Sequence, residues 1–276
     1  MQLKEFNDKA SKTSKRNDKK TVNISTIKHA IVRPVPDSYN LCVRTNVEKI
    51  DVALAKSQHT EYCRALQKLG LKLIWVEGDN TLTDSCFVED TAIVLEEKAI
   101  ICNMKVKSRA KEVVEVAKVL EKLKETHCIT PPATIDGGDV LKIGHKVFVG
   151  VSARTNLQAI RQLRKIVENS NLQIVPVKVH NVLHLKSVCT YLGNNYVILS
   201  KGHFDINILR DYNIIMVPKG EEYAADCLAI NGTVIIAKDH PKTKKLVEKE
   251  GFFIKELEIS EFRKGEGALT CLSILC

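Results

Sequence analysis

The feature that most constrains the fold is a loose internal repeat that runs through most of the 276 residues. Helical periodicity recurs five times, and each time a short segment rich in β-forming residues follows. The helical segments are residues 48–69, 108–126, 154–169, 204–212 and 241–250. The segments that follow them are residues 71–76, 127–131, 172–177, 213–218 and 252–257. A period of roughly 40–50 residues is typical of folds built from similar units packed side by side.

Most repeats continue into a two-part apolar run broken by a turn, which predicts a β-hairpin. These runs are residues 91–102, 139–150, 187–200 and 227–237, and Asn231-Gly232 in the last run is the strongest turn signal. The final unit, residues 268–276, lacks a return strand, which residues 28–35 could supply to close a ring. Hairpins need antiparallel pairs, which a doubly wound parallel sheet lacks. We therefore expect an α/β ring of strand-hairpin-helix units around a central axis, with a doubly wound sheet as the alternative.

Residues able to take part in chemistry recur where a loop enters a hairpin. Glu89 and Asp90 precede the first hairpin, Asp136 the second, His184 the third, and Cys271 the last apolar run. In units arranged around an axis, such junctions meet at one end of that axis. The repeat therefore gives a geometric reason for residues far apart in the chain to share a site.

Two of these residues could act on a substrate, and each has a structural alternative. Cys271 ends a loop of small residues, but a free cysteine often packs as a small buried hydrophobe. A reactive thiol needs its pKa lowered from about 8.5 by a cation or a positively charged substrate. His184 stands between leucines on an expected strand, where a core histidine is common, although its pKa range suits proton transfer. With His180 it also forms a weak zinc-binding pattern.

Acidic and basic residues offer further binding groups. Asp136, in an Asp-Gly-Gly-Asp turn, could orient a histidine. Asp84, Glu89 and Asp90 lie among apolar residues, and carboxylates in a partly dry site suit planar donors such as guanidinium. The alternative for this acidic loop is a solvated surface. Two arginines at expected helix starts could be solvated or could clamp a substrate carboxylate, namely Arg109 and Arg154.

Composition limits the classes of partner. The net charge is +9, and residues 1–28 hold eight of the Lys and Arg residues against three acids. We expect residues 1–26 to be a disordered basic tail and residues 27–276 to be a single catalytic domain. A solvated tail is favoured over one that binds nucleic acid or an anionic membrane. No apolar run reaches the roughly 18 residues of a membrane span. Nine scattered cysteines without a CxxC pair favour reduced thiols in the cytosol.

Six motifs in order give the chain a resemblance to a known family. They are residues 29–38 (HAIVRPVPDS), 84–90 (DSCFVED), 135–140 (IDGGDV), 148–156 (FVGVSARTN), 183–187 (LHLKS) and 267–271 (GALTC). Together they resemble the dimethylarginine dimethylaminohydrolase family of the pentein superfamily. The resemblance implies a five-bladed α/β propeller and hydrolysis of methylated arginine to citrulline. An arginine or agmatine deiminase of the same superfamily and a catalytically silent binding protein are the alternatives.

The resemblance also implies roles for individual residues. Cys271 is the expected nucleophile, His184 its acid–base partner, and Asp136 the group that orients the histidine. The remaining expected contacts are to the substrate: Glu89 and Asp90 to the guanidinium, with Asp84 nearby, Arg109 and Arg154 to the α-carboxylate, and Val43, Phe87, Gly265 and Glu266 in the pocket. Relatives carry Asp in place of Glu266, and the extra methylene could alter the grip on the α-amino end.

The same reasoning gives expectations for ligands and location. We expect a small guanidino compound as substrate, no cofactor, and no required metal, although Cys271 beside an imidazole could capture an inhibitory zinc ion. We expect a cytoplasmic monomer or homodimer, with no membrane or nucleic-acid partner.

Overall fold

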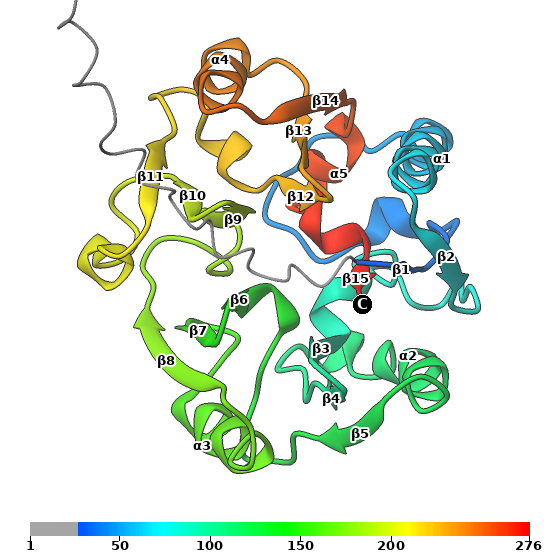
Figure 1. Ribbon diagram of the computed structural model, residues 1–276. Helices are drawn as coiled ribbons and strands as arrows, with labels where there is room; N and C mark the ends of the chain where they lie inside the picture. Colours follow the sequence, from blue (N-terminus) through cyan, green and yellow to red (C-terminus); the bar gives the residue numbers. More distant parts are fainter. Residues whose placement is uncertain (1–26) are drawn as a thin grey trace, which may run out of the picture.

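The computed structural model describes residues 27–276, and the predicted disordered tail over residues 1–26 lies outside them. Within this part of the chain, the strands form five three-stranded sheets around a common centre (Figure 1). The sheets are β15-β1-β2, β3-β4-β5, β6-β7-β8, β9-β10-β11 and β12-β13-β14. The strands are β1 (His29–Val32), β2 (Lys72–Trp75), β3 (Ala92–Leu95), β4 (Lys98–Ile101), β5 (Glu125–Cys128), β6 (Val140–Ile143), β7 (Lys146–Val151), β8 (Gln173–Lys178), β9 (Cys189–Gly193), β10 (Tyr196–Leu199), β11 (Asn213–Met216), β12 (Leu228–Ile230), β13 (Thr233–Ala237), β14 (Phe253–Leu257) and β15 (Ile274–Leu275). The predicted five-bladed ring is confirmed.

Each sheet combines an antiparallel pair with a parallel third strand. In the second sheet, β3 pairs antiparallel with β4, and β5 then pairs parallel with β4. The first sheet differs because its antiparallel partner comes from the other end of the chain: Ala30 of β1 lies opposite Leu275 of β15. Residues 28–35 therefore supply the missing return strand, as predicted, and the two ends of the repeat are joined by hydrogen bonds.

The predicted hairpin turns lie where the sequence placed them. Asn231 and Gly232, between β12 and β13, have φ values of 48° and 85°. Positive φ at both central residues is the requirement of the two-residue turn that matches the twist of paired strands. The Asn-Gly pair therefore fixes the register of this hairpin locally, before any packing.

Four helices lie on the outside of the ring (Figure 1). They are α1 (Val52–Lys68), α2 (Val113–Leu120), α3 (Leu157–Ile166) and α4 (Pro241–Lys249). Each returns the chain to the start of a parallel strand, a connection that a tight turn cannot make. Their starts are encoded locally: Asp51 and Asn156 cap α1 and α3 through their side chains, and Pro241 opens α4.

Three predicted elements differ from the structure. Residues 204–212 form only a 3₁₀ turn, η5 (Ile206–Leu209), which Asp205 caps through a hydrogen bond from the N–H of Asn207. Its backbone N–H groups bond three residues back, as from Arg210 to Asn207, and β11 begins at Asn213. The helix predicted over residues 108–126 is limited to α2, and β5 begins two residues before the predicted segment. A short helix that was not predicted, α5 (Ser260–Lys264), precedes the final unit.

The core is a ring of interfaces between neighbouring sheets. Among residues 27–276 it divides into five apolar clusters, each of which joins two adjacent sheets. One cluster joins Ile100 of β4 to Val147 of β7, and the cluster that closes the ring joins Val32 of β1 to Ile235 of β13. The apolar face of each sheet is thus covered by its neighbours, which explains why a single unit would be unstable alone. Across residues 27–276, no helix has the length and apolar character needed to cross a membrane.

Candidate active site

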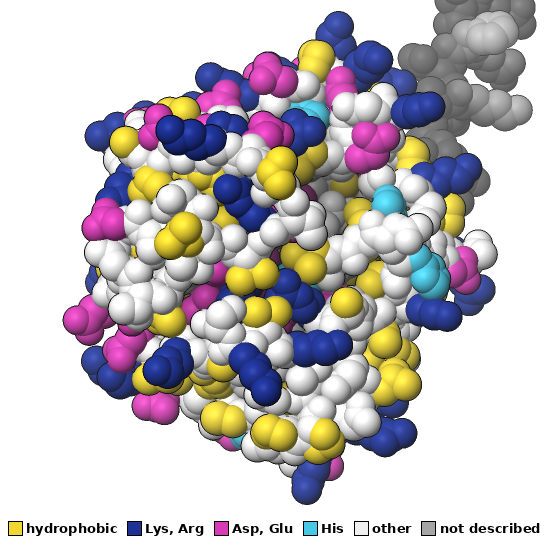
Figure 2. Space-filling view, turned by 180° about the vertical axis from the view of Figure 1, so that it is seen from behind, with side chains coloured by type: hydrophobic (Ala, Val, Ile, Leu, Met, Phe, Trp, Pro, Cys, Tyr) yellow, Lys and Arg dark blue, Asp and Glu magenta, His cyan; other side chains and the backbone are white. Residues whose placement is uncertain are grey.

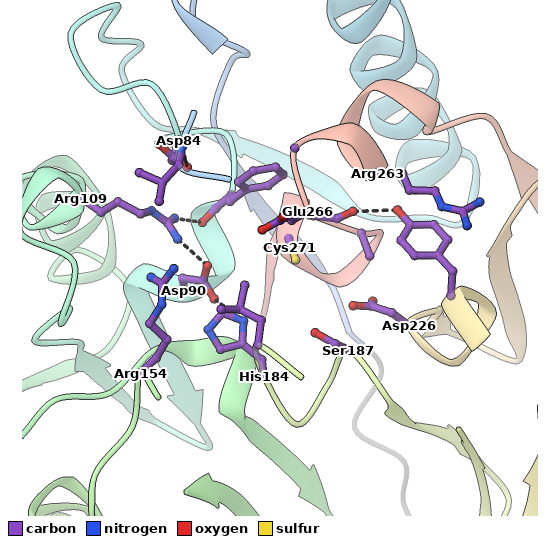
Figure 3. Close-up of a pocket in the computed structure, with 17 residues that line it drawn as sticks. Asp84, Asp90, Arg109, Arg154, His184, Ser187, Asp226, Arg263, Glu266 and Cys271 are labelled. Carbon is purple, nitrogen blue, oxygen red and sulfur yellow. Dashed lines mark hydrogen bonds and ion pairs between the residues drawn. The ribbon is translucent and has the colours of Figure 1, made fainter. Parts of the chain in front are cut away.

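A pocket of about 800 Å³, including its open mouth, lies where the loops entering the hairpins meet. Its walls carry Asp90 before β3, His184 before β9, Asp226 before β12 and Cys271 before β15 (Figure 3). In the space-filling view, one face of the molecule is hollowed near its centre, with Lys and Arg side chains close to the hollow (Figure 2).

Short turns, not strands, present these side chains. Asp90 lies in the 3₁₀ turn η2 (Val88–Thr91) and Cys271 in η7 (Thr270–Leu272). His184 lies in a loop, which corrects the prediction that it occupies a strand. The reason is that the loop bonds to the neighbouring unit: the N–H of Leu185 donates to Asp139 Oδ1 at 3.0 Å. Neither Arg109 nor Arg154 begins an α-helix: Arg109 ends the 3₁₀ turn η3 (Lys107–Arg109) ahead of α2, and Arg154 lies in the loop ahead of α3.

His184 is held between two buried carboxylates. Its Nε2 lies 3.1 Å from Asp136 Oδ2, and its Nδ1 lies 3.8 Å from Asp90 Oδ1. Burial alone would lower the pKa of His184, but the charge of Asp90 and the hydrogen bond to Asp136 raise it to about 9. The imidazole is therefore protonated near neutral pH in the free protein, and it can act as a proton donor.

Asp90 is held by a buried arginine. Its Oδ2 accepts a hydrogen bond from Arg109 Nη1 at 2.8 Å, and its Oδ1 accepts one from the N–H of Gly138 at 3.2 Å. Burial would raise the pKa of Asp90, yet the charges of His184 and Arg109 bring it down to about 2. Arg109 also pairs with Glu112, at 2.9 Å from Nη2 to Oε2, and is only 4% exposed. Its guanidinium is thus engaged with protein carboxylates.

Arg154 is the freer of the two arginines. It lines the pocket, and its Nη1 lies 3.5 Å from Asp136 Oδ2 without a hydrogen-bond partner among the described residues. The guanidinium points into the pocket on the same side as His184 (Figure 3). An anionic group of a ligand could be held there.

Cys271 lies in the wall opposite to Arg109. Burial, followed by the negative charges of Asp226, Glu89 and Asp90, raises the pKa of its thiol well above the ordinary value. In the free protein the sulfur is therefore a thiol. A cation bound among these carboxylates would reverse their effect and favour the thiolate.

Glu89 lies beside the pocket, and the expectation that it contacts a guanidinium stays a prediction. Within the described chain it does not line the pocket, and its Oε1 forms an ion pair with Lys186 Nζ at 2.5 Å. Asp136 likewise lies behind the wall, where it contacts His184. The other predicted site residues line the pocket: Val43, Asp84, Phe87, Asp90, Arg109, Arg154, His184, Gly265, Glu266 and Cys271.

Two of these acids bind backbone groups at the pocket mouth. Asp84 Oδ1 accepts a hydrogen bond from the N–H of Val43 at 3.0 Å. Glu266, which has a φ of +60°, accepts hydrogen bonds from the N–H groups of Thr45 and Asn46 at 2.8 and 3.0 Å. Both carboxylates therefore fasten the loop around residues 43–46 beside the pocket.

Sequence reasoning missed several lining residues: Leu183, Ser187, Tyr223, Asp226, Arg263, Gly267 and Ala268. A signal for Asp226 was available, because it stands immediately before the fourth hairpin, at the junction where the other repeats carry Asp90, Asp136 and His184. No repeat signal marks Tyr223 or Arg263, which meet through a cation–π contact of 4.9 Å.

Two glycines are required by close packing at the site. A Cβ on Gly138 would lie 2.7 Å from His184 Nδ1 and 2.9 Å from Asp90 Oδ1. A Cβ on Gly267 would lie 2.2 Å from the ring of Phe87. Side chains at either position would displace the groups that shape the pocket.

Three described residues, Asp90, Asp136 and His184, have ligand atoms close enough together to hold a metal ion. Their contacts are explained without one, since Arg109 and His184 already neutralise the carboxylates. Cys271 and His180 lie outside this group. The sequence-based expectation that Cys271 could capture zinc stays a prediction.

Comparison with known sequences places the chain among related enzymes. Residues 37–236 match the sequence model of N,N dimethylarginine dimethylhydrolase, eukaryotic. The N(G),N(G)-dimethylarginine dimethylaminohydrolase of Pseudomonas aeruginosa is 32% identical over 90% of this chain and 98% of its own length. The protein of the same name from Streptomyces coelicolor is 35% identical over 90% of this chain and 96% of its own length.

Solved structures agree with the sequence matches. A variant of the Pseudomonas aeruginosa enzyme complexed with citrulline superimposes with a TM-score of 0.87 at 30% identity, covering 91% of this chain and all of that one. The N-terminal domain of the arginine dihydrolase ArgZ superimposes with a TM-score of 0.83 over 91% of this chain and 97% of that one; at 18% identity it supports the fold alone. On these matches, the chain belongs to the dimethylarginine dimethylaminohydrolase family.

Proposed function

We propose that this protein hydrolyses Nω-methylated arginine to citrulline and releases dimethylamine or methylamine. The observation that carries the proposal is that a thiol, Cys271, and a protonated imidazole, His184, line one pocket together with buried carboxylates. The relatives named as dimethylarginine dimethylaminohydrolases support the choice of substrate and of reaction.

The charges of the pocket match a cationic amino acid. Asp90 is ionised beside His184 in the interior and offers a negative surface to the guanidinium. Arg154 lines the pocket, and its guanidinium is held by protein only through the ion pair of 3.5 Å with Asp136 recorded among the described residues, so it would take the α-carboxylate. We assign Arg109 to holding Asp90, because its donors are already used on Asp90, Glu112 and the carbonyl of Phe87.

The first chemical step is attack of sulfur on the guanidinium carbon. The bound cation offsets the carboxylates that keep Cys271 protonated, and the thiol proton leaves to water. The thiolate then forms a C–S bond. His184 donates its proton to the methylated nitrogen, and the C–N bond breaks to release a neutral amine.

The second step is hydrolysis of the covalent thiouronium intermediate. His184, now neutral and still held by Asp136, takes a proton from water, which attacks the same carbon. Collapse of the resulting tetrahedral species breaks the C–S bond, the hydroxyl proton returns to the departing sulfur through water, and citrulline and the resting thiol are left. The carboxylates stabilise the cationic intermediate throughout.

Mass spectrometry of protein quenched during turnover of asymmetric dimethylarginine tests this function. We expect citrulline and dimethylamine as products, and an adduct of the substrate-derived amidine on the peptide that contains Cys271. The peptide with the exposed thiol of Cys128 is the internal control and should stay unmodified. Turnover of arginine without amine release from methylated substrates would contradict the proposal.

We further propose that residues 27–276 act as a single catalytic domain, as a monomer or homodimer in the cytoplasm. The apolar clusters run from sheet to sheet around the ring, which supports a unit that folds as a whole. A nucleophilic thiol also favours a reducing compartment.

A further inference from the structure

We propose that Asp226 is a second guanidinium-binding carboxylate, which faces Asp90 across the pocket and receives the nitrogen that stays on the product. This inference rests on the proposed function and names a residue that determines its specificity for a cation.

Asp226 stands beside the nucleophile. It follows the 3₁₀ turn η6 (Glu222–Ala225) and enters β12, and its side chain is buried yet lines the pocket. Its Oδ1 accepts a hydrogen bond from the N–H of Thr270 at 3.3 Å, the residue before Cys271. Its carboxylate points into the cavity on the side away from Asp90 and His184, with the sulfur of Cys271 next to it (Figure 3).

The other acids near the sulfur are engaged or lie outside the pocket lining. Asp90 accepts hydrogen bonds from Arg109 and Gly138. Glu89 pairs with Lys186 through Oε1, and its Oε2 has no hydrogen-bond partner among the described residues, but the side chain does not line the pocket. Within residues 27–276, the hydrogen bonds that Asp226 accepts come from Thr270 alone. The rest of its accepting capacity is therefore available to a ligand.

The shape of a guanidinium makes a second acceptor necessary. Its three nitrogens lie in one plane, 120° apart, around the carbon that Cys271 attacks. If the methylated nitrogen faces His184, the other terminal nitrogen points toward the opposite wall. A buried N–H group without an acceptor there would weaken binding. Asp226 provides the acceptor on that wall.

The charge of Asp226 is also linked to the charge of the ligand. Burial and the neighbouring charge of Glu89 raise its pKa to about 7, although Lys186 acts in the opposite direction. A cation between Asp226 and Cys271 favours the carboxylate and the thiolate together. Asp226 therefore favours binding of a positively charged group over binding of a neutral group of the same shape.

The variant Asp226→Asn tests the inference, since it removes the charge, keeps the size, and retains an oxygen for Thr270. We expect the KM for monomethylarginine to rise about tenfold or more, as for loss of a hydrogen bond to a charged group. Inhibition by citrulline, whose urea group is neutral, should change less than about threefold. The matched control is Asp211→Asn, an exposed acid paired with Lys146, which should leave both values unchanged.

A second readout concerns the free enzyme. Because the charge of Asp226 opposes ionisation of Cys271, alkylation of this thiol by iodoacetamide at pH 8 should be faster in Asp226→Asn than in the wild type. If Asp226→Asn fails to fold, Asp226→Ser repeats both measurements, since water can then reach the N–H of Thr270.

The outcomes separate this inference from the proposed function. Wild-type turnover with an unchanged KM in Asp226→Asn would overturn the role of Asp226 and leave the function intact. Equal weakening of monomethylarginine and citrulline would also overturn it, because that result indicates general damage to the pocket. If the wild type fails to turn over methylated arginines at all, both proposals are refuted.

Discussion

The two walls of the pocket differ in how completely their charges are paired. On the histidine wall, His184 pairs with both Asp90 and Asp136, and Arg109 forms a further ion pair with Asp90. On the cysteine wall, the sulfur of Cys271 and the carboxylate of Asp226 face the cavity with few fixed partners.

Because of this difference, the proton donor and the nucleophile are activated in different ways. The proton donor is prepared in the resting protein, because fixed carboxylates keep His184 protonated. The nucleophile is prepared only by the ligand, since the carboxylates around Cys271 keep it a thiol until a cation arrives. A thiol of this kind is protected from side reactions while the site is empty.

The largest expected effect concerns the cysteine wall. Cys271→Ser should lower kcat by a factor on the order of 10³ or more, because the alcohol is a far weaker nucleophile, with little change in the free energy of unfolding. Citrulline formation followed over time measures the first effect, and urea unfolding the second. Cys128→Ser, at an exposed thiol, is the control and should behave as wild type. Hydrolysis by Cys271→Ser at the wild-type rate would contradict the nucleophile assignment.

The next effect concerns the stability of the histidine wall. Arg109→Met should lower the free energy of unfolding by about 3–5 kcal/mol, because it leaves Asp90 and Glu112 buried without their cation. Urea titration measures the loss. The matched control is Arg64→Met, which breaks an exposed pair with Glu61 and should cost under about 1 kcal/mol. Equal losses in the two variants would mean that the histidine wall does not depend on this pairing.

The pH dependence of stability distinguishes the walls by their titration ranges. The folded pKa of His184, about 9, exceeds its unfolded value of about 6.5. Its contribution, up to roughly 3 kcal/mol, is therefore complete below about pH 6.5 and is lost as pH rises through about 9. Urea unfolding between pH 6 and 10 measures this loss.

Two variants assign the pH-dependent loss to a wall. In Asp136→Asn the alkaline loss should shrink, because the hydrogen bond that helps to raise the His184 pKa is weakened. Asp226→Asn should leave the alkaline loss of stability caused by His184 largely unchanged. It should remove a separate loss of stability that occurs as pH rises toward about 7, because the raised pKa of Asp226 favours its neutral form in the folded protein. The reverse pattern would show that the walls titrate as one unit.

The smallest effect tests how tightly the histidine wall is packed. Gly138→Ala should lower kcat by about tenfold to a hundredfold, because the added methyl group displaces His184 and Asp90 from their positions. Steady-state kinetics measures the change. Gly78→Ala is the matched control, as its Cβ would meet the ring of Pro34 at an ordinary 3.7 Å. Full activity in Gly138→Ala would show that the wall adapts more easily than its contacts indicate.

Local sequence signals determined the repeated units. Asn231 and Gly232 specify a hairpin by their own backbone preferences, and Asp51 starts a helix by bonding to a neighbouring N–H. Such interactions join residues close in the chain, so the order and approximate bounds of most elements could be predicted. The segment around Ile206–Leu209 was predicted as a longer helix and forms a 3₁₀ turn, because apolar periodicity does not show how far a helix extends.

Only the tertiary structure decided what each charged residue does. From the sequence, Glu89 and Asp90 are equivalent neighbours, yet packing of the units turns Asp90 into the pocket and pairs Glu89 with Lys186. Arg109 likewise became a buried partner of Asp90. The sequence by itself determined the repeated units and the position of the reactive residues at the loop that enters each hairpin, since both follow from short-range interactions. The partners and pKa values depend on burial and on charges from distant segments, which exist only once the ring is closed.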